Sequence, residues 1–127
     1  SHGFEFQKYG TTTGFDEMLR LLDPATSTIE LDLGNLVAAG ADPAHYLRTY
    51  PGRFRLAHVK DWRAPLVPDP LQIPPSAPFG RGAIDWPPLV AAAKSSGVQH
   101  FFIEQEELPQ DQVVGAIADS HRYLKSI

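Results

Sequence analysis

Three short apolar runs in this chain each end in a polar side chain that can bind a metal ion. Ile29-Glu30-Leu31 is followed by Asp32, Phe54-Arg55-Leu56-Ala57 by His58, and Phe101-Phe102-Ile103 by Glu104. Parallel strands present their C-terminal ends at one edge of a sheet, so three such runs would bring these side chains together. Oxygen and imidazole ligands suit Mn²⁺, Mg²⁺, Co²⁺ or Zn²⁺ better than Ca²⁺ or a soft metal. The pattern therefore predicts a divalent-metal site on a parallel sheet.

Segments with helical periodicity alternate with extended segments along the whole chain. The expected strands are residues 3–9, 28–33, 54–60 and 100–105, and the expected helices are residues 15–22, 36–39, 43–50, 86–96 and 110–124. Four strand-then-helix units of this kind predict an α/β fold with a parallel sheet and right-handed crossovers. The 127 residues suffice for one domain, residues 1–127, whereas a complete (βα)₈ barrel needs about 250 residues. The units therefore form either a small open sheet or half of a barrel.

Composition excludes several classes of partner. The formal net charge is −4 and no cluster of Lys or Arg stands out, which argues against a nucleic-acid-binding protein. No stretch approaches the roughly 20 apolar residues of a membrane helix, so no membrane association is expected. The absence of cysteine excludes disulfides and thiolate ligands. A cytoplasmic location is the expectation, although a longer precursor could carry an export signal.

A long irregular segment, residues 61–82, follows the third expected strand. It carries six prolines, namely Pro65, Pro68, Pro70, Pro74, Pro75 and Pro78. That length is unusual for a plain connection and typical of a functional loop. Trp62 and Phe79 flank the loop, and one of them is a candidate to line a bound ligand, a role that we assign to Trp62.

Five motifs resemble the xylose isomerase-like family of sugar phosphate isomerases and epimerases, which are TIM barrels. They are Glu30-Leu31-Asp32-Leu33-Gly34, Ala57-His58-Val59-Lys60-Asp61 followed by Arg63, Phe102-Ile103-Glu104-Gln105, Gly80-Arg81-Gly82-Ala83-Ile84-Asp85-Trp86, and His2-Gly3-Phe4-Glu5-Phe6. Each motif is weak alone, but together they follow the family's order and spacing. The resemblance implies that the chain is the C-terminal half of a (βα)₈ barrel, about strands 5 to 8, without the N-terminal half.

The resemblance also implies roles for individual residues. Asp32, His58 and Glu104 would be metal ligands, with Glu104 also the catalytic acid/base. Arg63 would contact the substrate oxygens and support catalysis. The ligand that relatives carry on the fifth strand falls at or before the start of this chain, where His2 or Glu5 would have to replace it, and His2 is also a candidate substrate contact. Asn35 stands where relatives often have His or Trp.

Simpler explanations exist for the same residues. Asp32 could cap a helix, His58 could be a core histidine, and Glu104 could belong to a solvated acidic loop that continues through Glu107. Structural pairing is the expected role of Lys60 and Asp61.

The expected function is that of a divalent-metal-dependent sugar or sugar phosphate isomerase or epimerase, an enzyme in its full-length form. It would abstract a proton next to a carbonyl to give an enediolate, with weak or no turnover in this chain. One alternative is a dehydratase that acts on a keto-inositol (inosose), and another is a non-catalytic sugar-binding or assembly domain. The net charge disfavours a metal-dependent nuclease. The partners expected are a sugar or keto-inositol and a second copy of the chain, associated through exposed half-barrel edges.

Overall fold

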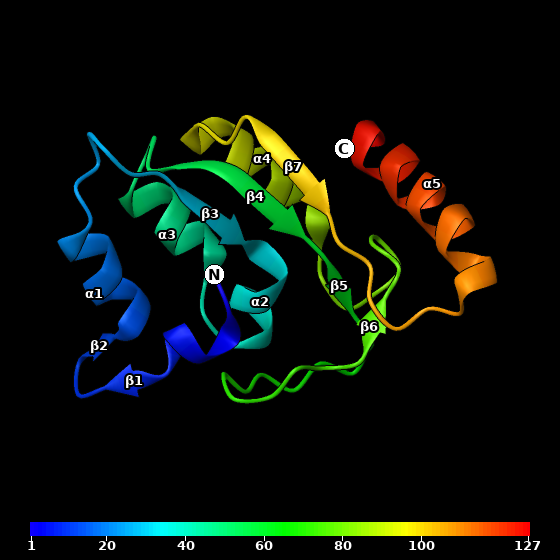
Figure 1. Cartoon of the computed structure of the whole chain (residues 1–127), viewed down its shortest axis with the longest axis horizontal. Helices are drawn as coiled ribbons and strands as arrows, with labels where there is room; N and C mark the ends of the chain where they lie inside the picture. The colour runs from blue at the N-terminus through cyan, green and yellow to red at the C-terminus, as the bar shows by residue number, and fades with distance from the viewer.

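The computed structural model describes residues 1–127 and is built around a sheet of three parallel strands in the order β3-β4-β7. The elements are a 3₁₀ helix η1 (Gly3–Phe6), β1 (Lys8–Tyr9), β2 (Thr12–Thr13), α1 (Gly14–Leu21), β3 (Ile29–Asp32), α2 (Leu33–Ala38), α3 (Pro43–Thr49), β4 (Phe54–Val59), β5 (Asp61–Trp62), β6 (Ser76–Ala77), α4 (Trp86–Ser96), β7 (His100–Ile103) and α5 (Gln110–Ser126). Figure 1 shows the three central arrows running in the same direction, as the alternation of elements predicts.

Helices cover one face of this sheet. The core contains Leu31 and Ala57 from the strands, Leu47 from α3 and Val90 from α4, all at most 1% exposed. Local sequence signals set the ends of these helices. The side chain of Asp42 caps α3 ahead of Pro43, and Gly97 ends α4 with a φ of 108°.

The pleat of the strands divides their residues between the two faces of the sheet. Ala57 and Val59 of β4 are buried against the helices, whereas Leu56 and His58 alternate with them and lie on the opposite face. Asp32 pairs with His58, and His58 pairs with Phe102 of β7. Phe102 remains 47% exposed, so this second face is only partly covered.

The strand predicted for residues 3–9 is wrong. Residues 3–6 form η1, and Lys8–Tyr9 pairs only with Thr12–Thr13 in a short antiparallel hairpin. Local contacts explain the difference. The backbone N–H of His2 donates to Glu5 at 2.9 Å, which closes a capping box at the start of η1. Phe6 packs on Phe15 with ring centroids 4.8 Å apart, whereas Phe4 is 58% exposed, so the two phenylalanines do not line one buried strand face.

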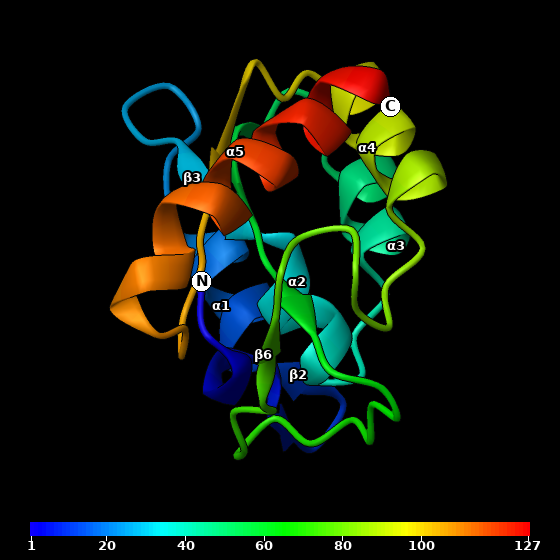
Figure 2. The same cartoon turned by 90° about the vertical axis from the view of Figure 1, so that its right-hand side faces the viewer.

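The long proline-rich segment and α5 lie at the edges of the molecule. The segment is held at both ends by the antiparallel pairing of β5 with β6, and between them it passes as an extended loop below α2 (Figure 1). Figure 2 shows the C-terminal end of α5 next to α4, where Lys94 Nζ donates to the carbonyl of Ile127 at 2.8 Å. No helix combines the length and the apolar character that crossing a membrane requires.

Candidate metal centre

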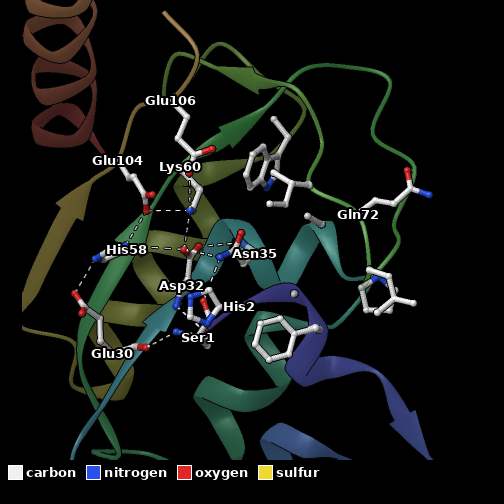
Figure 3. A pocket seen from close by; sticks show the side chains of 17 residues that line it. Ser1, His2, Glu30, Asp32, Asn35, His58, Lys60, Gln72, Glu104 and Glu106 are labelled. Atoms are coloured by element: carbon white, nitrogen blue, oxygen red, sulfur yellow. Dashed lines mark hydrogen bonds and ion pairs between the residues drawn. The ribbon is translucent and has the colours of Figure 1, made fainter.

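The three residues singled out by the strand ends lie together. Asp32 ends β3, His58 lies near the end of β4, and Glu104 directly follows β7. One ligand atom from each of them lies within 4.8 Å of the other two. They line a cavity of about 620 Å³, which Figure 3 shows bounded by the sheet edge, η1 and the proline-rich loop. The juxtaposition that the sequence predicts is therefore present in the structure.

Asp32 is both a member of this cluster and a helix cap. It is 3% exposed, its Oδ1 accepts from the backbone N–H of Asn35 at 2.9 Å, and its Oδ2 accepts from the Asn35 side chain at 2.9 Å. Burial raises the pKa of Asp32, because the donors around the carboxylate only partly replace lost water. Since the cap occupies Oδ1, Oδ2 is the oxygen directed at the rest of the cluster.

His58 lies between two carboxylates. Its Nδ1 is 2.9 Å from Glu104 Oε2 and 3.9 Å from Asp32 Oδ2, while its Nε2 is 3.1 Å from Glu30 Oε1. Without an ion, the contact between Nδ1 and Glu104 is a hydrogen bond only when Nδ1 carries a proton. With the proton on Nε2 instead, facing Glu30, the Nδ1 lone pair would be free to bind an ion. This is the arrangement in which a carboxylate orients a metal-binding imidazole.

Lys60 supplies the cation of the cluster. Its ammonium is 2.9 Å from Glu104 Oε2 and 3.2 Å from Asp32 Oδ2, and the residue is 7% exposed. Burial lowers the pKa of Lys60, but the Asp32 and Glu104 carboxylates outweigh burial and raise it overall. For Glu104, burial raises the pKa, but the hydrogen bonds from Lys60 and His58 outweigh burial and lower the pKa to about 2. Glu104 is therefore an ionised carboxylate at neutral pH.

Asp61 plays a structural role beside the cavity. It is 0% exposed, and its carboxylate accepts from the backbone N–H groups of Gly80, Gly82 and Ile84 and from the indole N–H of Trp86, at 3.0 to 3.2 Å. A Cβ at Gly82 would lie 2.2 Å from the Asp61 carboxylate, so only glycine fits there. The glycine-containing motif before α4 thus wraps a buried aspartate and does not face the cavity.

The other residues expected at the site differ in position. His2 lines the cavity, with its side chain 70% exposed. Trp62 also lines it, but it is 1% exposed and its indole N–H donates to the Gly34 carbonyl at 2.7 Å, so it braces the wall. Arg63 is exposed, is absent from the cavity lining, and donates to the Ser76 carbonyl at 3.5 Å. The structure does not bring Arg63 to the cluster.

Sequence reasoning gave no functional role to three further residues that line the cavity. Glu30 and Lys60 lie two residues from Asp32 and His58, so the two-residue repeat of a strand places them on the same face and could have identified them. Glu106 lies beyond the end of β7, where no such repeat applies, and only the structure brings it to the cavity.

The donor set fits a divalent ion. One imidazole nitrogen and two carboxylate oxygens converge from three strand ends, and a three-residue set leaves coordination positions for water or substrate. The Glu30 carboxylate lies 3.1 Å from His58 Nε2, and the Asn35 amide donates to Asp32, so both ligands have outer partners that can hold them in place.

The sequence and the fold of this chain are similar to those of known sugar isomerases and dehydratases. An inosose dehydratase from Geobacillus thermodenitrificans is 30% identical over 123 residues, which cover 89% of this chain and 40% of that protein. A sugar phosphate isomerase/epimerase from Parabacteroides distasonis has a TM-score of 0.77 at 23% identity, covering 99% of this chain and 44% of the solved one. A xylose isomerase domain protein from Planctomyces limnophilus has a TM-score of 0.66 at 20% identity, covering 87% and 42%. No protein-family model matches the chain.

The fold and the cluster define an α/β half barrel with acidic and imidazole side chains at its strand ends. The solved relatives show that this is the fold of xylose isomerase-like proteins, so the predicted class, the C-terminal half of a (βα)₈ barrel, is confirmed apart from the strand at residues 3–9. The family resemblance is confirmed at the level of the fold. The chain spans about 40% of the length of the curated relative that it matches.

Proposed function

We propose that this chain carries the metal-binding strand ends of a divalent-metal-dependent enzyme that acts on a sugar, sugar phosphate or keto-inositol. The observation that supports the proposal best is the convergence of Asp32, His58 and Glu104, whose ligand atoms lie within 4.8 Å of one another at the floor of a cavity. Mn²⁺, Mg²⁺, Co²⁺ and Zn²⁺ all suit this set. The names of the relatives point to the substrate class.

The proposed reaction is proton abstraction next to a carbonyl. A bound divalent ion would polarise the carbonyl and make the proton on the neighbouring carbon more acidic. Glu104, whose side chain is 34% exposed at the cavity, is the carboxylate that would accept that proton and give an enediolate. Glu30 would hold the His58 ring, and Asn35 would hold the Asp32 carboxylate. The acid on the opposite face of the substrate is not among the cluster residues, so we expect weak turnover from these residues alone.

A titration with Mn²⁺ followed by calorimetry tests the metal centre. Wild type is expected to bind one ion per chain, and Asp32→Asn is expected to abolish binding, because Asn keeps a capping oxygen but removes the charged ligand. Asp119→Asn is the matched control, since Asp119 lies on the exposed face of α5 and pairs only with Arg122. Equal Mn²⁺ binding by wild type and Asp32→Asn would refute the proposal.

Elimination of water is the second candidate reaction, because a curated relative that covers 89% of this chain is an inosose dehydratase. Dehydration and epimerisation share the first proton abstraction, so the same residues would serve both. Proton magnetic resonance of a keto-inositol incubated with the chain and diamagnetic Mg²⁺ in ²H₂O separates them. Deuterium exchange without loss of water favours isomerase or epimerase chemistry, and an unsaturated product favours the lyase.

The proposal includes association through the strands at the edges of the sheet. β3 and β7 each have β4 as their only sheet neighbour, so each has one edge without a strand partner. Phe102 of β7 is 47% exposed on the open face of the sheet. A second copy of the chain is the proposed partner.

A further inference from the structure

Lys60 is the only Lys or Arg among the residues that line the cavity. Four carboxylates, those of Glu30, Asp32, Glu104 and Glu106, line the same cavity. The Lys60 side chain is 9% exposed and reaches between two of these carboxylates, as Figure 3 shows. A buried ammonium in this position balances the charge of Asp32, whose side chain is 5% exposed, and part of the charge of Glu104.

The ammonium contacts the same oxygens that would coordinate an ion. It is 3.2 Å from Asp32 Oδ2, and the Asp32 Oδ1 is already taken by the helix cap. It is also 2.9 Å from Glu104 Oε2, the oxygen that faces His58 Nδ1. An ammonium and a divalent ion cannot both hold these oxygens at short range, because their like charges would lie within a few ångströms of each other.

A second position for the ammonium exists within reach of the same side chain. Lys60 Nζ is 3.5 Å from Glu106 Oε1 and 5.6 Å from the centre of the Trp62 ring. A carboxylate and an aromatic face are both favourable partners for a lysine cation. Four side-chain torsions let Nζ move toward these groups without a change in the backbone.

We propose that Lys60 is an internal cation that competes with the divalent ion for Asp32 and Glu104, and that it shifts to Glu106 and Trp62 when the ion binds. This inference rests on the proposed metal centre. Lys60 then sets the affinity of the centre and, when no ion is present, holds the two carboxylates in place by bridging them. Glu106 acts on the ion only through Lys60, by stabilising the displaced ammonium.

Calorimetric titration of Mn²⁺ into charge variants tests this competition. Lys60→Met is expected to bind Mn²⁺ at least about tenfold more tightly than wild type, since a close charge pair contributes 1.4 kcal/mol or more. Lys60→Gln, which keeps a polar side chain, is expected to change affinity in the same direction. Lys8→Met is the matched control, because Lys8 is exposed on β1, outside the cavity lining.

A thermal melt gives a second readout that does not depend on activity. Without metal, Lys60→Met is expected to melt below wild type, because Asp32 and Glu104 lose their counter-ion. Addition of Mn²⁺ is expected to raise its melting temperature by more than it raises that of wild type.

A double-mutant cycle with Glu106→Gln tests whether Glu106 acts by stabilising the displaced Lys60 ammonium or by attracting the ion directly. Glu106→Gln is expected to weaken Mn²⁺ binding in the wild-type background and to have little effect in the Lys60→Met background. An equal loss of Mn²⁺ affinity in both backgrounds would mean that Glu106 attracts the ion directly. That result would overturn the proposed shift of Lys60 toward Glu106.

The outcomes distinguish this inference from the metal centre itself. If wild type binds Mn²⁺ and both Lys60 variants bind equally or more weakly, the competition is overturned and the centre stands. If neither wild type nor Lys60→Met binds, the centre fails and the competition with it. Loss of the wild-type circular dichroism spectrum in both variants would also count against a displaceable cation, since it would make Lys60 essential to the fold.

Discussion

At the scale of single residues, the cavity depends on pairs spaced two apart along each strand. Glu30 and Asp32 come from β3, and His58 and Lys60 come from β4 and the residue after it. A strand repeats its side-chain direction every two residues, so one residue of each pair can contact a ligand while the other supports it. Because these pairs bring acidic and basic side chains into contact, we expect the free energy of unfolding to depend on pH.

Glu104 provides that pH dependence. Its pKa falls from the ordinary 4.5 to about 2 in the folded chain, so its contribution to stability is complete above pH 4.5 and is lost as the pH falls toward 2. In the presence of a chelator, the difference in free energy of unfolding between wild type and Glu104→Gln should shrink over that range. Urea unfolding at several pH values measures it. The pH dependence should be smaller in a Lys60→Met background, and an identical slope there would contradict Lys60 as the main favourable contact.

Asp61 is the residue whose replacement should cost the most stability. Asp61→Asn sets amide N–H groups against the N–H donors of Gly80, Gly82 and Trp86, so buried donors lose their acceptor. We expect a loss of about 3 kcal/mol in the free energy of unfolding, measured in urea. Asp85→Asn is the control in the same loop, because Asp85 is exposed and its side chain makes no capping hydrogen bond. Similar losses for the two variants would argue against Asp61 as the organiser of the loop.

At the scale of elements, α2 lies against the cavity because a glycine permits a close approach. A Cβ on Gly34 would lie 2.4 Å from the Lys60 carbonyl and 2.6 Å from Lys60 Cγ. Gly34→Ala should therefore push α2 away from β4 and disturb both Asp32 and Lys60, at a cost of about 1 to 3 kcal/mol. Gly115→Ala in α5 is the matched control, since nothing lies within 4 Å of its Cβ position and alanine favours a helix. Thermal melts with and without Mn²⁺ compare them, and equal stability of the two variants would contradict the close approach.

The elements that sequence predicts well are those with strong local signals. Asp42-Pro43 and Gly97 fix the ends of α3 and α4, and the apolar runs fix β3, β4 and β7. The segment at residues 3–9 has alternating residues too, yet it forms η1, because a local capping hydrogen bond and one buried phenylalanine outweigh the alternation. Alternation predicts a strand only when a neighbouring strand is available to pair with it.

Part of the candidate site could likewise be predicted from local sequence, and part of it could not. The cluster of Asp32, His58 and Glu104 was predictable, because strand ends of a parallel sheet lie at one edge. The position of Arg63 was not, since it follows β5, whose antiparallel pairing with β6 is a long-range contact. The backbone N–H of Arg63 donates to the Pro75 carbonyl at 2.8 Å. This bond fixes Arg63 beside the β5–β6 pair, outside the cavity lining.

At the scale of the whole molecule, the last strand-and-helix unit carries exposed apolar side chains. Phe102 is 47% exposed on the open face of the sheet, and Val114 is 81% exposed on α5. Both belong to the last strand-and-helix unit, and β7 has β4 as its only sheet neighbour. Exposed apolar groups beside an unpaired strand edge favour association.

We therefore expect the 14.0 kDa chain to form dimers at micromolar concentration, with β7 and its open face in the interface. Light scattering over a dilution series measures the mass, and the weight-average value should rise with concentration. Phe102→Lys should shift the equilibrium toward the monomer, because a lysine side chain at an interface loses water without gaining a partner. Leu21→Lys is the matched control, since Leu21 is 69% exposed on α1 and distant from β7 in sequence, and Figure 1 shows α1 on the far side of β3 and α3 from β7. A monomer at all concentrations for wild type would contradict self-association. An equal shift by both variants would mean that the interface does not involve the open sheet face.

Because Glu104 directly follows β7, an interface there would also reduce access to the cluster. Mn²⁺ affinity measured across the same dilution series should therefore weaken as the dimer forms.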